Sequence, residues 1–108
     1  MSDWRSQPEL DMVAISALVA AVGKPVLDDM KGQFVADLER LVSAYSDAHG
    51  AENPDEARST AHALKGAASN IGLKRLAALA AELEQGQVED ADALPDVLQS
   101  AIRHLQAA

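Results

Sequence analysis

The residues best suited to chemistry lie in one short run, His62-Ala63-Leu64-Lys65-Gly66. A neutral imidazole is a good nucleophile near neutral pH, because the unperturbed pKa of histidine is about 6.5. Lys65 follows His62 by one helical turn, and a lysine ammonium can offset the charge of a phosphoryl group on that ring. Gly66 costs about 1 kcal/mol relative to alanine in mid-helix, which indicates a functional or packing requirement. The run is therefore suited to a nucleophilic histidine that a partner approaches closely.

The predicted helix around His62 gathers other polar side chains on the same side. Residues spaced by three or four positions share one helix face, and on this face lie Arg58, His62, Lys65, Gly66 and Ser69. The intervening positions turn toward a core, and these are Ala57, Ala61, Leu64, Ala68 and Ile71. We expect Ser69 and Asn70 to lie at the rim of a docking surface.

Most of these features also have a purely structural explanation. A single histidine on a helix is usually a solvated surface residue, which is what we expect of His49 and His104. Lys65 is compatible with an ordinary solvated lysine. Gly66 is compatible with close helix packing, and the sequence leaves both explanations of this glycine open.

The apolar spacing that must position these residues is helical throughout. Apolar residues recur every three or four positions in five segments, at about 6–23, 25–49, 54–71, 73–86 and from 92 onward. The short connections favour antiparallel neighbours. We predict an all-α fold, an antiparallel up-down four-helix bundle of the second to fifth helices. The short first helix packs on its end or side.

Local signals define several helix ends. Ser6 and Glu9 form a capping-box pattern for the first helix. Asn53 suits a cap and Pro54 a first helical position, so the third helix has the clearest start. Gly72 is expected to end that helix in a left-handed conformation.

Composition limits the function classes. The 108 residues suit a single domain, 1–108, and the net charge of −8 argues against a nucleic-acid partner and against anionic membranes. No run approaches the length of a membrane span, and the polar start, residues 1–5, does not resemble a signal peptide, so we expect a cytoplasmic protein. Without cysteine and without a His-x-x-x-His pair, a metal site is not expected.

A family resemblance adds to this interpretation. The run Ala61-His62-Ala63-Leu64-Lys65-Gly66, then Asn70-Ile71-Gly72-Leu73 and Glu82-Leu83-Glu84, resembles the signature of histidine-containing phosphotransfer (HPt) domains. The resemblance covers nearly the whole chain, including the helix order and helix lengths.

The resemblance implies roles by position. His62 matches the phosphorylated histidine, which takes the phosphoryl group on Nε2, and Lys65 matches the lysine that steadies its charge. Gly66 matches the small residue that lets a receiver domain dock. Glu84 matches an acidic or amide position that in some members bonds Nδ1 of the histidine, although a surface ion pair is an equal alternative here.

The resemblance also implies partners. It suggests a free-standing, monomeric phosphocarrier rather than an enzyme, which relays phosphoryl groups between receiver-domain aspartates in a two-component phosphorelay fed by a hybrid sensor kinase. No cofactor is expected on this chain, since the receiver is expected to carry the Mg²⁺. The alternative from the residues alone is a non-catalytic helical adaptor.

Overall fold

A computed structural model describes residues 3–108, which fold into five α-helices and two short 3₁₀ helices without a strand. The elements in chain order are η1 (Trp4–Ser6), α1 (Met12–Val22), α2 (Lys24–Gly50), α3 (Pro54–Asn70), α4 (Lys74–Glu84), η2 (Ala91–Ala93) and α5 (Leu94–Ala107). The predicted all-α class and helix order are confirmed. The prediction about the polar start of the chain includes Met1 and Ser2, which lie outside the described residues.

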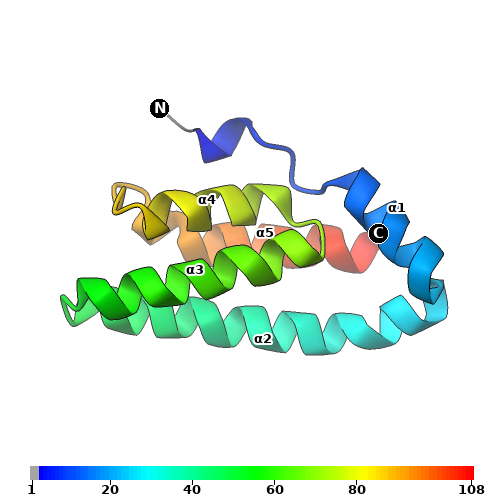
Figure 1. Ribbon diagram of the computed structural model, residues 1–108, viewed down its shortest axis with the longest axis horizontal. Helices are drawn as coiled ribbons and strands as arrows, with labels where there is room; N and C mark the ends of the chain where they lie inside the picture. The colour runs from blue at the N-terminus through cyan, green and yellow to red at the C-terminus, as the bar shows by residue number, and fades with distance from the viewer. Residues whose placement is uncertain (1–2) are drawn as a thin grey trace.

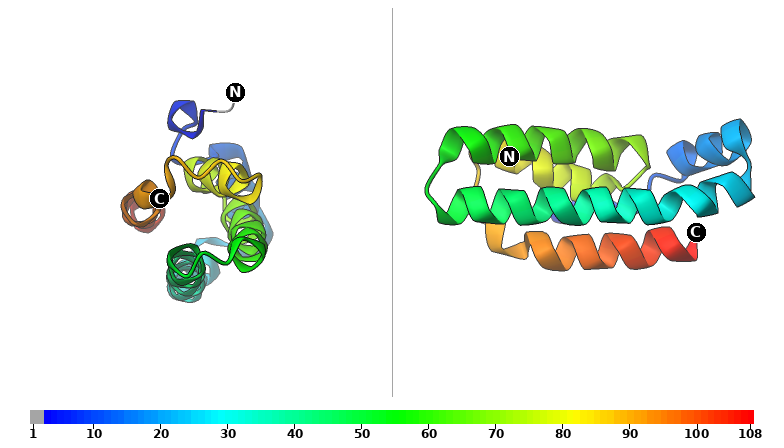
Figure 2. Two further views of the ribbon diagram at one scale, coloured as in Figure 1. Left: turned by 90° about the vertical axis from the view of Figure 1, so that its left-hand side faces the viewer. Right: turned by 90° about the horizontal axis from the view of Figure 1, so that it is seen from below.

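Helices α2 to α5 lie side by side, and each runs opposite to the one before it (Figure 1). Helix α3 packs mainly against α2 and α4, and α5 contacts both α2 and α4. Helix α1 packs against α2 at one end of the molecule, and η1 packs against α4 (Figure 2). The two faces of α3 therefore differ, because one faces its neighbours and the other remains open.

The core is almost entirely aliphatic, since only 3% of the residues are aromatic. Its largest fully buried side chains are Tyr45, Leu38, Leu64, Leu73, Leu76, Leu79 and Leu94. Trp4 joins this core from the N-terminal end of the chain, which the sequence interpretation did not anticipate. Close packing of these side chains fixes the position of α3 on the core.

The predicted ends of α3 are confirmed. Asn53 Oδ1 accepts a hydrogen bond from the backbone N–H of Glu56 at 3.3 Å, and Pro54 begins the helix. Gly72 follows the helix with φ +75°, a conformation that glycine adopts without a Cβ penalty. A Cβ on Gly72 would lie 2.9 Å from Ile15 Cγ1, so this turn also needs glycine for space.

The predicted start of the first helix is wrong. Helix α1 begins at Met12, and its N-cap is Asp11 rather than Ser6. The Asp11 N–H donates to the Gly72 carbonyl at 2.7 Å, and the Lys74 N–H donates to the Glu9 carbonyl at 3.1 Å. These bonds to the α3–α4 turn keep residues 9–11 out of an α-helix.

Two further boundaries differ from the sequence prediction. The last helix begins at Leu94 rather than Asp92, because η2 (Ala91–Ala93) precedes it. The apolar spacing of the first helix also predicts that Val13 faces the core, but on α1 the buried apolar residue is Ile15 and Val13 is exposed. The near-uniform apolar composition of α1 explains the second error, since it leaves no clear periodic stripe.

Candidate functional site

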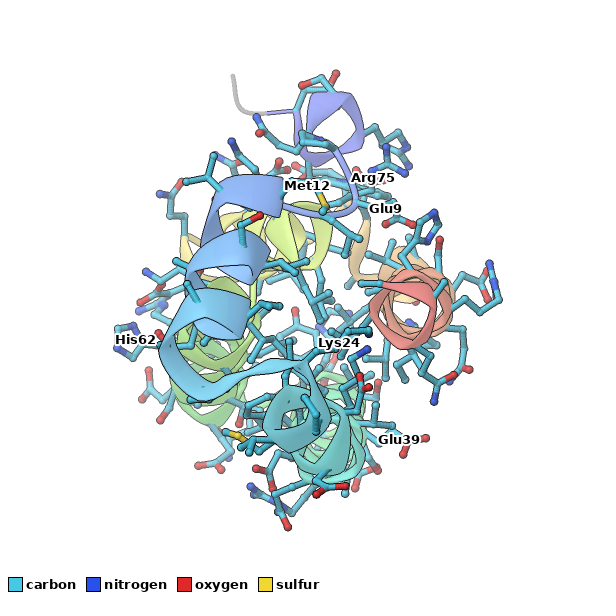
Figure 3. The ribbon with its side chains drawn as sticks, turned by 90° about the vertical axis from the view of Figure 1, so that its right-hand side faces the viewer. Glu9, Met12, Lys24, Glu39, His62 and Arg75 are labelled. Atoms are coloured by element: carbon cyan, nitrogen blue, oxygen red, sulfur yellow. The ribbon has the colours of Figure 1, made fainter. Side chains whose placement is uncertain are left out.

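His62 lies on the open face of α3, and its side chain is 69% exposed. Figure 3 shows the ring pointing away from the bundle. The residues predicted to share its face are exposed or half-buried, and these are Arg58, Lys65, Gly66 and Ser69. The residues predicted to face the core are all buried, and these are Ala57, Ala61, Leu64, Ala68 and Ile71. The amphipathic division of α3 predicted from the sequence is therefore present.

Packing of α3 against α4 brings the last residue of α4, Glu84, to the histidine. Nδ1 of His62 lies 2.6 Å from Oε2 of Glu84. An ionised carboxylate can only accept hydrogen bonds, so Nδ1 carries the proton and donates it. In the neutral ring the lone pair is then on Nε2, the nitrogen that the carboxylate does not hold.

The second oxygen of the same carboxylate binds a cation. Nζ of Lys65 lies 2.6 Å from Oε1 of Glu84, and the Glu84 side chain is 23% exposed. The hydrogen bond from Lys65, and next the bond from His62, hold the pKa of Glu84 below its ordinary value. Glu84 therefore stays ionised at neutral pH and keeps its bond to the ring.

Gly66 leaves open space beside the imidazole. A Cβ built at this position has no heavy atom within 4 Å, apart from its own helix backbone and chain neighbours. Close packing inside this chain therefore does not explain the glycine. The absent side chain instead leaves the surface low next to His62.

The remaining predicted residues lie at different distances from this centre. Arg58 lines a shallow hollow of about 330 Å³ together with His62 and Glu84. Ser69 and Asn70 are exposed farther along α3, and they line two separate hollows on its opposite flanks. They lie at the periphery of the face and not around the imidazole.

Two residues of the hollow that His62 lines were not identified from the sequence. Asp55 and Ser59 line it with His62 and Arg58. Their positions seven and three residues before His62 place them on the same helix face, which was a usable signal.

The other histidines have different surroundings. His49 stacks on Tyr45, with the ring centroids 5.8 Å apart. Nδ1 of His104 lies 2.8 Å from the Ser100 carbonyl oxygen of its own helix and 3.2 Å from Oε2 of Glu9. His49 lines a different hollow from the one that His62 lines.

Across residues 3–108, no group of three or more histidine, aspartate or glutamate side chains is arranged to hold a metal ion. Within the same range, no helix combines the length and the apolar character needed to cross a bilayer.

Comparisons with known proteins give a family match and a similar solved structure. Residues 29–108 match the family model described as the Hpt domain. The crystal structure of histidine-containing phosphotransfer protein B (HptB) from Pseudomonas aeruginosa PAO1 is similar, with a TM-score of 0.73 and 30% sequence identity. The similarity covers 94% of this chain and 91% of that chain. No sequence among the curated proteins matches this chain.

Proposed function

Since the chain belongs to the Hpt domain family, with a histidine phosphotransfer role in two-component phosphorelays, we propose that His62 is its phosphoryl-carrying residue. The observation that carries this proposal is the bond between Nδ1 of His62 and Glu84 on an otherwise exposed ring. That bond leaves the Nε2 lone pair for an incoming phosphoryl group.

The proposed step is a phosphoryl transfer from an acyl phosphate. The Nε2 lone pair of His62 attacks phosphorus of a phosphoaspartate, the bond from phosphorus to the aspartyl oxygen breaks, and the carboxylate leaves with its electron pair. The ring becomes positively charged with the proton still on Nδ1, where the Glu84 carboxylate stabilises it. Transfer to a second receiver is the reverse step, and Mg²⁺ is expected on the receiver side.

We assign Lys65 to charge compensation. Its ammonium lies on the Glu84 carboxylate, one turn from His62, and its flexible stem allows it to turn toward phosphoryl oxygens on Nε2. The carboxylate then balances the imidazolium while the ammonium balances the phosphoryl group.

The docking surface in this proposal is the open face of α3. Gly66 lets a receiver domain approach the ring, while Arg58, Ser69 and Asn70 contact it around the edge. The carrier acts as a cytoplasmic monomer with one domain, 1–108, in which α2 to α5 form an up-down four-helix bundle. A hybrid sensor kinase and response-regulator receivers are its partners.

The test is incubation of the purified chain with a phosphorylated receiver domain and Mg²⁺. We expect acid-labile, alkali-stable phosphate on the chain, and no label from ATP and Mg²⁺ alone. A non-catalytic helical adaptor would bind a partner without being labelled, so absence of label from several phosphorylated receivers would contradict the proposal.

A further inference from the structure

The N-terminal segment, residues 3–11, is attached to the end of α4 that carries Glu84. Trp4, the only tryptophan in the chain, is 6% exposed although it lies outside residues 29–108, the part that matches the family model. Its backbone N–H donates to Oε2 of Glu82 at 2.9 Å, and its indole Nε1–H donates to Oδ2 of Asp90 at 2.9 Å. Trp4 thus bonds on both sides of the end of α4, to Glu82 through its backbone and to Asp90 through its side chain.

The last turn of α4 has a different partner on each side. Glu82 is buried toward η1, whereas Glu84, two residues later, bonds His62 and Lys65 on α3. Residues two apart point in nearly opposite directions on a helix. Figures 1 and 2 show the same arrangement, with η1 and α3 on opposite sides of α4.

Arg5 strengthens the attachment of η1. Its guanidinium forms two hydrogen bonds to the Asp90 carboxylate, at 3.0 and 3.1 Å, and lies 4.3 Å from the Trp4 ring centroid. Asp90 belongs to the connector that leaves α4, so η1 holds both the last turn and the chain that follows.

Helix ends fray unless something holds them, and α4 ends at Glu84 itself. We propose that Trp4 is a positioning residue, whose buried indole and its bond to Asp90 seat η1 against the last turn of α4, where the backbone N–H of Trp4 binds Glu82, and so keep Glu84 on Nδ1 of His62. This inference rests on the proposed role of His62, but it concerns the tautomer of the ring and can be measured without any phosphoryl transfer.

The other end of the same N-terminal segment supplies a matched control. Glu9 contacts Ser100 and His104 of α5, and its carbonyl accepts the Lys74 N–H at the start of α4. Lys74 and Glu84 are the first and last residues of the 11-residue α4, so about 15 Å of helix, at 1.5 Å for each step, separate them. Loss of the Glu9 side-chain contacts therefore loosens the N-terminal segment without reaching the end of α4.

The experiment compares wild type with Trp4→Ala, Trp4→Phe and Glu9→Gln. Long-range ¹H–¹⁵N NMR spectra report the tautomer of His62, and single-turnover transfer from a phosphorylated receiver gives the maximal rate and the half-saturating concentration. Melting curves set a temperature at which every variant is folded. If Trp4→Ala does not fold, Trp4→Phe, which keeps an aromatic ring but loses the indole N–H, carries the test.

We expect Trp4→Ala to convert the Nδ1–H form of neutral His62 into a mixture of tautomers. The maximal rate should fall by about tenfold, the value of one hydrogen bond to a charged group, with an unchanged half-saturating concentration. Trp4→Phe should lie between Trp4→Ala and wild type, and Glu9→Gln should match wild type.

Wild-type His62 spectra in folded Trp4 variants would overturn the inference, and so would equal shifts in Trp4→Ala and Glu9→Gln. If His62 proves not to carry phosphate, the proposed function fails, while the tautomer measurement still decides the role of Trp4.

Discussion

Two carboxylates in this protein each contact Nδ1 of a histidine. Glu84 lies 2.6 Å from Nδ1 of His62, and Glu9 lies 3.2 Å from Nδ1 of His104. Both carboxylates also have a basic side chain within 4 Å of the second oxygen. Figure 3 shows His62 on one side of the molecule and Glu9 on another, next to α5.

The two sites differ in what their carboxylates do. Both oxygens of Glu84 have partners at 2.6 Å, and the ring it holds is 69% exposed. Glu9 is 11% exposed, also accepts from the Ser100 hydroxyl, and has one oxygen, Oε1, without a hydrogen bond. Its nearest cation at that oxygen, Arg75, is 3.8 Å away.

Glu9 therefore joins the N-terminal segment to α4 and α5, whereas Glu84 orients a ring on an open face. The same residue types serve attachment in one place and chemistry in the other. The difference lies in the exposure of the ring, 69% for His62 against 49% for His104, in the close cation and in the low surface beside His62.

The largest expected effect is the loss of the carrier histidine. His62→Ala should abolish phosphate uptake from a phosphorylated receiver and leave the melting temperature nearly unchanged, because an exposed side chain leaves no cavity. His104→Ala should take up phosphate as wild type does. If His62→Ala still takes up phosphate and the double variant His62→Ala/His104→Ala does not, then His104 and not His62 carries the phosphate.

The next effect concerns the two cations. Lys65→Ala should slow transfer by about tenfold or more, since an ion contact at a partly desolvated site contributes about 1–3 kcal/mol. Arg75→Ala, which lies at the Glu9 site, should leave the transfer rate unchanged. Both rates are measured at sub-saturating receiver, and equal rates for Lys65→Ala and wild type would make Lys65 a bystander.

A smaller effect is expected in the pH dependence of folding stability, through the carboxyl group of Glu84. Its pKa is lowered from an ordinary value of 4.5, first by Lys65 and then by His62. A carboxyl with a depressed folded-state pKa contributes stability above the unfolded pKa and loses it as the pH falls through the folded pKa. The stability difference between wild type and Glu84→Gln should thus be constant near neutral pH and shrink below about pH 4.5.

The same property can be read directly from the carboxyl ¹³C shift of Glu84. Its titration midpoint should lie below 4.5 in wild type and rise in Lys65→Ala, more than in His62→Ala, because Lys65 is the larger cause. A wild-type midpoint at or above 4.5 would contradict the ion contacts described for this site.

The smallest effect is expected at Gly66. Gly66→Ala should raise the free energy of unfolding by up to about 1 kcal/mol, because the added methyl enters open space on a helix. Gly66→Gln should remain folded but slow transfer, since its side chain stands beside His62. Urea melts and transfer rates on both variants distinguish a docking role of Gly66 from a packing role. If both variants are destabilised, the glycine is needed for packing.

The sequence alone determined α3 and the face that it presents. Asn53, Pro54 and Gly72 act through local hydrogen bonds and backbone dihedral angles, which neighbouring residues decide. The three- and four-residue spacing then placed Lys65 on the same side as His62, because helix geometry needs no information from the rest of the chain.

Tertiary structure decided what lies across from that face. The sequence left Glu84 equally compatible with a surface ion pair, and only the packing of α4 on α3 brings its carboxylate to Nδ1 of His62. Bonds to the α3–α4 turn, more than sixty residues away, likewise overrode the capping-box pattern at Ser6. The burial of Trp4 depends on Glu82 and Asp90, and no local pattern can predict hydrogen bonds between residues so far apart in the chain.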